Sequence, residues 1–247
     1  MALGNLPTGD EKRLRVREMF DRIAPRYDAL NRVMSLGLDQ RWRRRSLDKI
    51  DVGPDDFVVD LACGTGDFCE LAALRGARVT GIDFAFRMLR RARDRGLEYT
   101  LVQGDAEWLP FRSGSVDVVT CGFALRNFVS LEAVMREMAR IIKPGGRVAL
   151  IDVDRPSWKP LRVAHSLYFD RLVPLIGGIV SDQAAYRYLP QSTAYLPPPD
   201  ALKSMLSGAG FLDVDREILL LGSAQIITGI RGPLTPAGLR SEVCSSE

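Results

Sequence analysis

Apolar and polar positions alternate along the middle of the chain with two different periods. Five short apolar runs, typical of buried strands, occupy residues 57–61, 77–82, 99–102, 116–122 and 147–153. Three intervening stretches have the apolar spacing of amphipathic helices, at residues 67–74, 84–95 and 131–142. Strands that alternate with helices in this way predict a parallel, doubly wound α/β sheet with crossover connections.

The stretches on either side of this centre have other patterns. Residues 11–49 predict two or three helices, with breaks at Pro25 and Gly37. After Pro156 we expect, in chain order, an aromatic and apolar helical stretch at 161–180, a polar loop at 181–192, a helix from Asp200 to about Gly208 or Gly210, and two strands at 211–221 and 224–230 joined by Gly222 and Ser223. These two strands predict an antiparallel pair at the sheet edge.

The amino-acid composition limits the kinds of metal and catalytic site that the chain can form. The 247 residues are 46% hydrophobic, which excludes a disordered or collagen-like chain. The single histidine, His165, excludes a histidine-cluster metal site and a multi-histidine relay, so we expect no metal and chemistry through other groups or a cofactor. The cysteines Cys63, Cys69, Cys121 and Cys244 fit neither a CxxC pair nor a zinc pattern, and this favours a reducing, cytoplasmic setting.

Positive charge is concentrated near the N-terminus. The net charge is +3, and residues 1–50 contain 12 basic and 7 acidic side chains. The run 41–45, Arg-Trp-Arg-Arg-Arg, suits nucleic acid, anionic lipid, an acidic ligand or simply a solvated helix face. We expect no secretory signal and no membrane span, because the longest apolar tract, 172–180, is far shorter than the roughly 20 residues that a span needs.

A glycine loop follows the first predicted strand. Residues 60–66 read Asp-Leu-Ala-Cys-Gly-Thr-Gly, and ligands of open α/β sheets bind at such carboxyl ends. A dinucleotide fingerprint needs a third glycine, where this chain has Cys69, and would place a pyrophosphate where Asp67 opens the helix. An acid at this place favours a cofactor that has no phosphate and carries positive charge.

S-adenosylmethionine is such a cofactor, with a sulfonium, an ammonium and no phosphate. Asp83 follows the second strand, 19 positions after Gly64, which is close to the spacing of a ribose-binding acid. Asp105 follows the third strand, where it can bind the adenine amine, and Asp60 would lie behind the loop. The alternative is a tight structural turn with unrelated surface carboxylates.

Several segments of the chain resemble the demethylmenaquinone and ubiquinone C-methyltransferases, a branch of the class I methyltransferases. They lie at residues 19–28, 31–37, 42, 60–67, 104–107, 109–111, 123–127, 143–146, 174–177, 186–189 and 191–192. The most specific are the Tyr-Asp…Asn…Met-Ser block of the N-terminal part, the Leu-Arg-Asn triplet at 125–127 and the Tyr-x-Tyr-Leu segment at 186–189.

The resemblance implies a Rossmann-like fold with a seven-stranded, mostly parallel sheet, an antiparallel edge hairpin and an added helical lid. It also implies S-adenosylmethionine-dependent C-methylation of a prenylated quinol ring, with demethylmenaquinol as the preferred acceptor. A benzoquinol of the ubiquinone pathway, or another small molecule or lipid, stays open as the acceptor. A nucleic-acid methyltransferase is a weaker rival, because the chain lacks an Asn/Asp-Pro-Pro-aromatic sequence and a Pro-Cys pair. A non-catalytic cofactor-binding protein is a further rival, which absence of methyl transfer to any quinol would favour.

The resemblance further assigns site residues, because the family's cofactor contacts fall on Thr65, Asp83, Asp105 and Ala106. Together with Cys63, Gly64 and Gly66 of the glycine loop, these are the predicted cofactor-binding residues. A serine that is frequent in the fourth strand of the family is Gly122 here, so one hydrogen bond to cofactor or substrate is in question.

Four residues are our catalytic candidates. Arg126 and Asn127 are expected to hold or polarise the ring oxygens, and a structural Arg–carboxylate pair is the alternative. Tyr27 and Asp28 are expected on the inner face of the lid, with helix capping and packing as the alternative. His165 is either a proton acceptor or a bystander.

These patterns divide the chain into five predicted segments. They are a helical lid (1–50), a cofactor-binding core (51–156), an inserted acceptor-binding segment (157–198), the C-terminal part of the sheet (199–231) and a flexible tail (232–247). As partners we expect a prenylated quinol and no nucleic acid. Contact with the membrane surface is expected through the basic residues 43–45, and a homodimer is left open.

Overall fold

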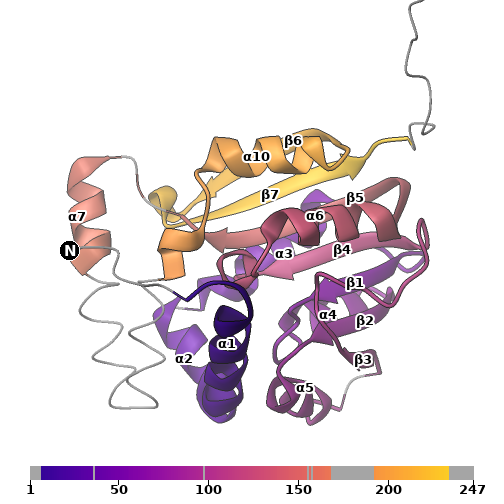
Figure 1. Cartoon of the computed structure of the whole chain (residues 1–247), viewed down its shortest axis with the longest axis horizontal. Coiled ribbons are helices and arrows are strands. Elements are labelled where there is room, and N and C mark those ends of the chain that lie inside the picture. The colour runs from indigo at the N-terminus through magenta and orange to yellow at the C-terminus, as the bar shows by residue number, and fades with distance from the viewer. Residues whose placement is uncertain are drawn as a thin grey trace, which may run out of the picture.

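One mixed sheet forms the centre of the protein. The computed structural model describes residues 7–35, 37–96, 98–154, 156, 158–167 and 192–233, and within these ranges seven strands have the order β3-β2-β1-β4-β5-β7-β6. The strands are β1 (Phe57–Leu61), β2 (Arg78–Asp83), β3 (Thr100–Gln103), β4 (Val116–Gly122), β5 (Ile142–Val153), β6 (Phe211–Leu219) and β7 (Ala224–Arg231). The first five are parallel, and β7 is antiparallel to both β5 and β6 (Figure 1). This arrangement confirms the predicted sheet.

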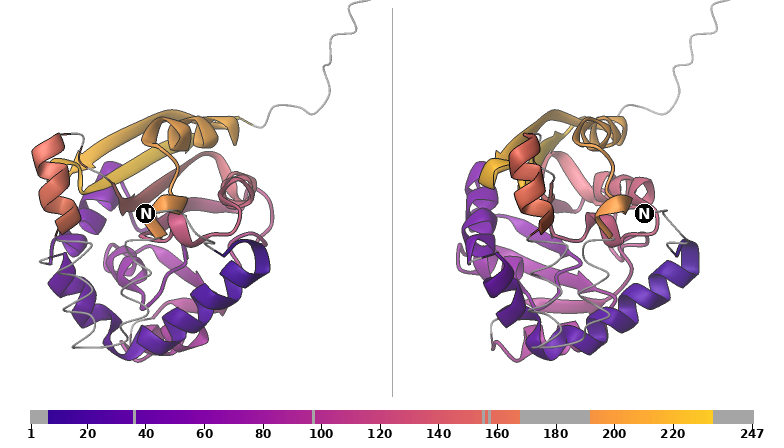
Figure 2. Two further views of the ribbon diagram at one scale, coloured as in Figure 1. Left: turned by 60° about the vertical axis from the view of Figure 1, so that its left-hand side comes forward. Right: turned by 90° about the vertical axis from the view of Figure 1, so that its left-hand side faces the viewer.

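Helices lie on both faces of the sheet (Figure 2). They are α1 (Gly9–Ile23), α2 (Tyr27–Met34), α3 (Leu38–Lys49), α4 (Asp67–Ala73), α5 (Phe86–Arg93), α6 (Leu131–Ile141), α7 (Lys159–Leu167) and α10 (Pro199–Gly208). Short 3₁₀ turns occur at η1 (Ala24–Arg26), η2 (Leu125–Asn127), η4 (Thr193–Tyr195) and η5 (Leu220–Gly222). The breaks expected at Pro25 and Gly37 are confirmed, since Pro25 lies in η1 and Gly37, at φ 73°, precedes α3.

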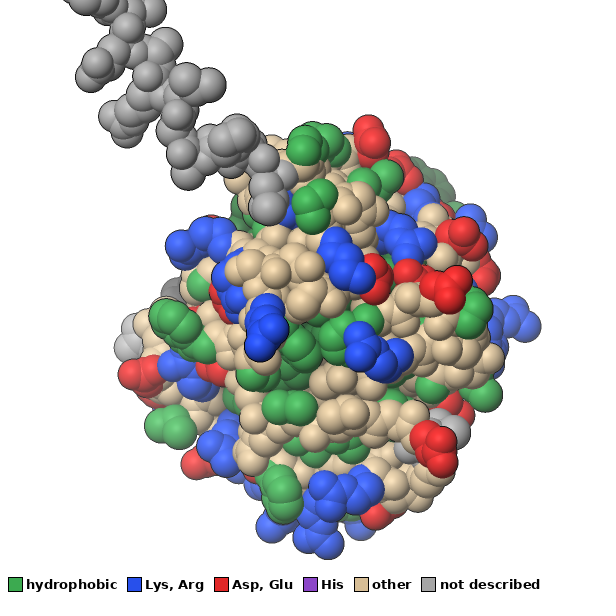
Figure 3. All heavy atoms as spheres, turned by 90° about the vertical axis from the view of Figure 1, so that its right-hand side faces the viewer, with side chains coloured by type: hydrophobic (Ala, Val, Ile, Leu, Met, Phe, Trp, Pro, Cys, Tyr) green, Lys and Arg blue, Asp and Glu red, His purple; other side chains and the backbone are tan. Residues whose placement is uncertain are grey.

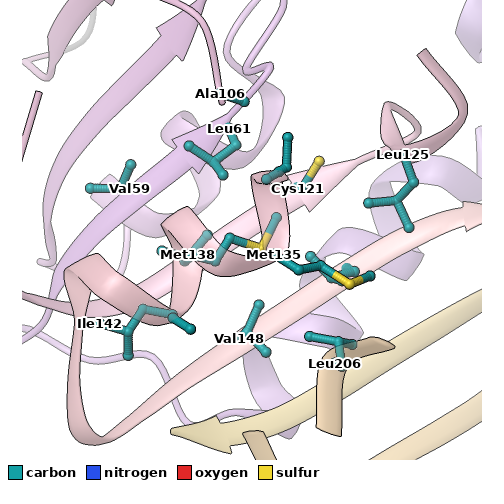
Figure 4. Close-up of a cluster of buried hydrophobic side chains, with 14 of the residues drawn as sticks. Val59, Leu61, Ala106, Cys121, Leu125, Met135, Met138, Ile142, Val148 and Leu206 are labelled. Atoms are coloured by element: carbon teal, nitrogen blue, oxygen red, sulfur yellow. The ribbon is translucent and has the colours of Figure 1, made fainter. Parts of the chain in front are cut away.

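Neighbouring residues of the central strands are buried on opposite faces of the sheet. Val58 of β1 and Val118 of β4 belong to the cluster under α3 and α4, whereas Val59 and Val119 belong to the cluster under α6 and α10. Figure 4 shows this second cluster, in which Met135 and Met138 of α6 are buried with strand residues. Burial on both faces explains why these strands have continuous apolar runs instead of alternating ones.

Two strand boundaries differ from the sequence prediction. β5 begins at Ile142 instead of Arg147, because Ile142 already pairs with Val116 of β4 and the register then shifts before Arg147 pairs with Val118. The Lys-Pro-Gly-Gly sequence is therefore a bulge inside the strand and not a stop before it. β6 ends at Leu219, and η5 precedes β7.

Several predictions fall on residues outside the described ranges. The helical stretch is described only as α7, and residues 168–191 and the tail from 234 onward are not described. The side chain of His165 also lies outside the description, so the segments 157–198 and 232–247 stay predictions. Among the described residues, no helix is long and apolar enough to cross a membrane.

Gly81 of β2 allows a close approach of α4 to the sheet. A Cβ atom at Gly81 would lie 2.7 Å from the sulfur of Cys69 and 2.8 Å from that of Cys63. We expect Gly81→Ala to lower the free energy of unfolding by about 1–3 kcal/mol, because two buried side chains must move. Chemical denaturation measures this loss.

The control is Gly53→Ala, because a Cβ at Gly53 meets no atom within 4 Å. Adding Cys69→Ala to the Gly81→Ala variant should recover part of the loss. A Gly81→Ala protein as stable as the Gly53→Ala protein would contradict the packing role.

Candidate functional site

A cavity lies at the carboxyl ends of the parallel strands. Its wall includes Ala62, Gly64, Asp83, Gly104, Asp105, Gly122 and Phe123 from the strand ends, and Arg13, Phe20 and Tyr27 from the N-terminal helices. The space within this wall, together with the part that is open to solvent, amounts to about 710 Å³. The sheet and the N-terminal helices together therefore build one site.

The Asp83 carboxylate fixes the glycine loop against the end of β2. One oxygen accepts a hydrogen bond from the backbone N–H of Gly64 at 2.8 Å, and the other accepts from that of Ala85 at 2.8 Å. Gly64 and Gly66 have φ values of 57° and 88°, which favour glycine. The loop thus turns sharply and keeps its backbone next to the cavity.

Burial raises the pKa of Asp83 to about 6, although the backbone hydrogen bonds from Ala85 and Gly64 oppose the shift. Behind the loop, burial likewise raises the pKa of Asp60 to about 7, against a hydrogen bond from Thr120. Asp60 is not part of the cavity lining, and its carboxylate accepts hydrogen bonds from Thr120 and Cys69. The loop therefore lies between two carboxylates that become protonated at a higher pH than exposed acids do.

Asp105 lines the opposite side of the cavity and already has a cationic partner. Its Oδ2 lies 2.9 Å from Nε of Arg13, whose guanidinium also pairs with Glu107 at 3.2 Å. Arg13 comes from α1, so this pair connects the N-terminal helix to the end of β3. A ligand that binds Asp105 must share the carboxylate with Arg13.

Other contacts hold the N-terminal helices over the cavity. Nζ of Lys12 donates to the carbonyl of Phe128 at 2.5 Å, and burial lowers the pKa of Lys12 to about 8. Asp21 accepts from the backbone N–H of Arg87 at 2.9 Å, which links α1 to α5. These links make the N-terminal helices a covering element, as the predicted lid requires.

Tyr27 and Asp28 occupy different places at the start of α2. Tyr27 lines the cavity, and its ring meets that of Phe20 edge to face with centroids 6.0 Å apart. Burial raises the pKa of Tyr27, although the Asn31 side chain and the nearby arginine charges oppose the shift. Asp28 lies behind the wall, where it accepts a hydrogen bond from Thr65 and pairs with Arg95 at 3.1 Å.

Asp67, which opens α4, lies in a cluster of guanidinium groups. It lies 2.9 Å from Arg95, 3.4 Å from Arg32 and 3.7 Å from Arg43. Burial raises the pKa of Asp67, but these three cations outweigh it and hold the pKa below its usual value. Asp67 thus joins α4 to α2, α3 and the end of α5. Asp83 and Asp105 are the acids that line the cavity and can bind a cofactor.

The expectation that Arg43 touches anionic lipid is wrong. Arg43 is only 5% exposed, pairs with Asp39 at 2.7 Å and packs on the rings of Phe68 and Phe123. Its side chain therefore belongs to the interior and cannot reach a membrane surface. Arg44 and Arg45 remain exposed on α3.

Phe68 and Arg43 also account for Gly122, the departure from the family serine. A Cβ at Gly122 would lie 2.9 Å from the Phe68 ring and 3.7 Å from Nε of Arg43. The Phe68 ring therefore fills the place that a serine side chain would take. Hydrogen bonding from a side chain is lost at this end of β4, and the backbone alone faces the cavity.

Arg126 and Asn127 are adjacent in the chain but have different surroundings. Asn127 of η2 lines the cavity, whereas Arg126 is buried behind it. The Arg126 guanidinium donates to the carbonyl of Phe123 at 2.9 Å and to the hydroxyl of Ser192 at 3.1 Å, and it pairs with Asp152 of β5. These contacts are those of a structural Arg–carboxylate pair, which is the alternative to a role in holding the ring oxygens.

The structure places the remaining predicted residues on or behind the wall. Gly64, Asp83, Asp105, Tyr27 and Asn127 line the cavity, whereas Cys63, Thr65, Gly66, Ala106, Asp28 and Arg126 are not part of its lining. Sequence reasoning missed Arg13 and Phe20 of α1. Phe20 lies within the resembling segment 19–28 but received no role there, and no motif distinguishes Arg13 from the other charged positions of α1. The ion pair of Arg13 with Asp105 and the ring contact of Phe20 with Tyr27 identify the two residues in the structure.

Sequence comparison with known families agrees with this geometry. The profile of the ubiE/COQ5 methyltransferase family matches residues 8–231. The chain belongs to this family. The match spans the N-terminal helices, the sheet and the segment between β5 and α10, so every part of the cavity wall lies within it.

Relatives within the family are similar over most of their length. A demethylmenaquinone methyltransferase of Thermus thermophilus is 43% identical over 220 residues, which cover 86% of this chain and 100% of that protein. A second one, of Roseiflexus castenholzii, is 41% identical and covers 92% and 97%. The ubiquinone/menaquinone biosynthesis C-methyltransferase UbiE of Geotalea daltonii is 38% identical and covers 89% and 97%.

Solved structures agree with the fold of this family member. A putative methyltransferase of Haloferax volcanii, in complex with the Trm112 methyltransferase activator, has a TM-score of 0.62 at 20% identity and covers 87% of this chain and 98% of its own. Phosphoethanolamine N-methyltransferase 2 of Haemonchus contortus, solved with S-adenosyl-L-methionine, has a TM-score of 0.60 at 14% identity, covering 78% and 53%. Similarity at this level identifies the class I methyltransferase fold.

The raised pKa of Asp83 predicts a pH-dependent affinity for S-adenosylmethionine. A carboxylate binds ribose hydroxyls and a cationic ligand better when it is ionised, so the affinity should increase as the pH rises through about 6. Calorimetric titrations of the protein with S-adenosylmethionine, at a series of pH values between 5 and 8, measure the dissociation constant.

Asp83→Asn should bind about a hundredfold more weakly at neutral pH, because it loses hydrogen bonds to a charged group. It should also lose the pH step near 6. Asp60→Asn is the matched control, because Asp60 does not line the cavity. An Asp83→Asn protein that keeps the affinity and the pH step would contradict the assignment.

Proposed function

We propose that the protein is an S-adenosylmethionine-dependent C-methyltransferase that methylates the ring of a prenylated quinol, converting demethylmenaquinol to menaquinol. The near full-length match to relatives named demethylmenaquinone methyltransferase carries the proposal. A cavity built jointly by the sheet and the N-terminal helices supports it, because both parts lie within the family match.

The residues of the wall fit S-adenosylmethionine. Asp83 is fixed by two backbone N–H groups, which orients its remaining lone pairs toward the cavity for ribose hydroxyls. Asp105 offers an acceptor for the adenine amine on the other side, and the glycine loop lets the methionine part approach the backbone. When bound, the cofactor supplies an electrophilic methyl group on a positively charged sulfur.

Tyr27 and Asn127 are the polar side chains that we assign to the acceptor ring. Both line the cavity, and they come from the covering helices and from the end of β4. Burial keeps the Tyr27 phenol protonated at neutral pH, so it can donate a hydrogen bond to a ring oxygen. Asn127 offers a further donor, and two donors on ring oxygens favour loss of a phenolic proton from the quinol to solvent. The ring carbon of the anion would then bond to the methyl group as the bond from methyl to sulfur breaks, which would leave S-adenosylhomocysteine, and the proton lost from that ring carbon would restore the hydroxyl.

Arg126 acts as a positioning residue in this proposal. Its contacts with Phe123, Asp152 and Ser192 hold the turn that carries Asn127. Alignment of the ring carbon with the methyl group supplies much of the rate in such reactions, about 7–11 kcal/mol in favourable cases. A turn fixed by a buried ion pair therefore contributes to catalysis without touching the acceptor.

A direct assay tests the proposal. Purified protein, labelled S-adenosylmethionine and chemically reduced demethylmenaquinone should give labelled menaquinone with release of one proton from the ring. The relative of Geotalea daltonii, whose name includes ubiquinone, favours a reduced benzoquinone precursor as the second candidate acceptor. We expect the naphthoquinol to give at least tenfold higher kcat/KM.

Variants at the two assigned residues connect the activity to the cavity. Tyr27→Phe and Asn127→Ala should each lower kcat by about ten- to a hundredfold, because each removes a donor to a developing negative charge. Labelled product from neither quinol, in a protein that binds S-adenosylmethionine, would contradict the proposal.

The positioning role of Arg126 predicts equal effects from both members of its ion pair. Arg126→Gln and Asp152→Asn should each lower the free energy of unfolding by about 3–5 kcal/mol, because the remaining partner is buried unpaired. Both should lower kcat to a similar extent, raise the KM for the quinol and leave the affinity for S-adenosylmethionine unchanged.

Arg147→Gln is the control for general destabilisation, because Arg147 pairs with Asp56 at the opposite end of the sheet. It should leave kcat unchanged well below the melting temperature. A loss of kcat in Arg126→Gln without a matching loss in Asp152→Asn would contradict the positioning role and indicate direct contact with the ring.

The partner predictions are proposals as well. A prenylated quinol is a small molecule with a tail that partitions into lipid, which supports contact between the protein and a membrane surface. A cytoplasmic location is proposed with it, and a homodimer stays a prediction. Since Arg43 is buried, the membrane contact needs another surface.

A further inference from the structure

Five bulky apolar side chains are exposed at one corner of the molecule. Trp158 precedes α7, and Val163 and Leu167 lie one helical turn apart on it, with exposed fractions of 67%, 70% and 56%. Leu220 and Leu221 of η5 are 52% and 75% exposed. We call these five residues the apolar rim. Side chains of this size and number at one corner are typical of an interaction surface.

The two parts of the apolar rim are structural neighbours. The backbone N–H of Asp154 donates to the carbonyl of Ser223 at 2.9 Å, and a Cβ at Gly222 would lie 3.0 Å from Cα of Pro156. η5 therefore packs against the segment that leads into α7. Figures 1 and 2 show α7 beside the turn between β6 and β7 from several directions.

The backbone at Leu220 and Leu221 is strained. Their φ values are 41° and 54°, in the left-handed region that favours glycine and asparagine. Exposed leucines at positive φ stabilise neither the turn nor the core. Backbone strain of this kind is typical of functional sites, and at this site the strained residues carry apolar side chains.

The apolar rim lies at the same edge of the sheet as the cavity. α7 follows the carboxyl end of β5, and Val153 at that end pairs with Ala224, which places η5 beside it. The cavity opens at the carboxyl ends of β1 to β4. A lipid surface in contact with the rim therefore lies next to the edge where an acceptor enters.

The charge around the apolar rim suits anionic lipid. Residues 158–167 contain Lys159 and Arg162 and no aspartate or glutamate, and Asp154, which precedes them, pairs with Arg216. Lys159 and Arg162 are exposed beside the apolar side chains, and a tryptophan such as Trp158 is typical of a membrane–water interface. Apolar side chains with basic ones around them are the pattern of a surface that binds an anionic bilayer.

We propose that the apolar rim docks the protein on an anionic lipid bilayer, with Leu220 and Leu221 inserted among the lipid chains. The biological reason rests on the proposed function, because a prenylated quinol is dissolved in the bilayer. The docking itself is a property of the surface and is measured without any acceptor.

The test is flotation with vesicles of phosphatidylcholine containing about one third phosphatidylglycerol, compared with pure phosphatidylcholine vesicles. We expect the wild-type protein to bind the anionic vesicles about tenfold more strongly than the neutral ones. Leu220→Asn combined with Leu221→Asn should lower the partition coefficient at least tenfold, because two apolar side chains no longer insert.

The asparagine variant separates docking from folding. Asparagine tolerates positive φ, so the variant should melt at the same or a higher temperature than the wild type while it loses vesicle binding. The matched control is Leu212→Asn combined with Ile230→Asn. These residues are also exposed but lie at the end of β6 and β7 that is opposite to η5, and the control should keep full vesicle binding. That end of the two strands is on the right in Figure 1, which is the side that Figure 3 turns toward the viewer.

Four results would overturn the proposal. They are no binding of the wild type to anionic vesicles, unchanged binding of the Leu220/Leu221 variant, loss of binding in Arg41→Gln combined with Arg44→Gln instead, and a wild-type dimer that the Leu220/Leu221 variant dissociates. The third would assign the contact to the basic face of α3, and the last would assign the rim to a second copy of the chain.

Activity measurements separate this proposal from the proposed function. The Leu220/Leu221 variant should methylate a short-chain, water-soluble quinol at the wild-type rate and a vesicle-embedded quinol at least tenfold more slowly. If no quinol is methylated, the proposed function fails while the flotation result stands. If the wild type and the Leu220/Leu221 variant methylated the vesicle-embedded quinol as fast as the water-soluble one, docking through the apolar rim would not help the acceptor to reach the site.

Discussion

The buried carboxylate of Asp67 is the point at which the N-terminal helices are tied to the sheet. It is 5% exposed and lies among Arg32 of α2, Arg43 of α3 and Arg95 after α5. A buried charge is costly unless it is paired, so the three helices must stay together around it. Because α2 provides Tyr27 for the cavity, this cluster decides whether the site has a complete wall.

The resulting site combines two sources with different rigidity. The sheet supplies Asp83 and Asp105 at the ends of strands that are buried on both faces, and such positions are fixed by the core. The N-terminal helices supply Arg13 and Tyr27, which are held by an ion pair with Asp105 and by a ring contact with Phe20. The part of the wall that comes from the sheet is therefore fixed by the core, whereas the part that comes from the helices depends on these side-chain contacts.

The sheet was readable from the sequence because its signals are local. The continuous apolar runs at β1 and β4 reflect burial on both faces, Asp83 is the last residue of β2, and Asp105 follows the end of β3 by two positions. The role of Arg43 was not readable, because a charge run predicts an exposed face and only the position of Phe68 and Asp67 shows that one member of the run is buried. Interactions between segments distant in the chain leave no periodic signal.

Arg126 shows the same limit within the site itself. The Leu-Arg-Asn triplet marks the end of β4 correctly, but the sequence gives no sign of Asp152, the partner 26 positions further on that holds Arg126 behind the wall. Neighbouring residues in a motif can thus have separate environments: Asn127 lines the cavity, and Arg126 is buried in the protein. A buried arginine that donates to Ser192, Phe123 and Asp152 gains little from moving toward a substrate, because the carboxylate left behind would be unpaired in the core. The geometry therefore favours a site in which positive charge comes with the cofactor, and the arginines of the protein serve to hold its walls in place.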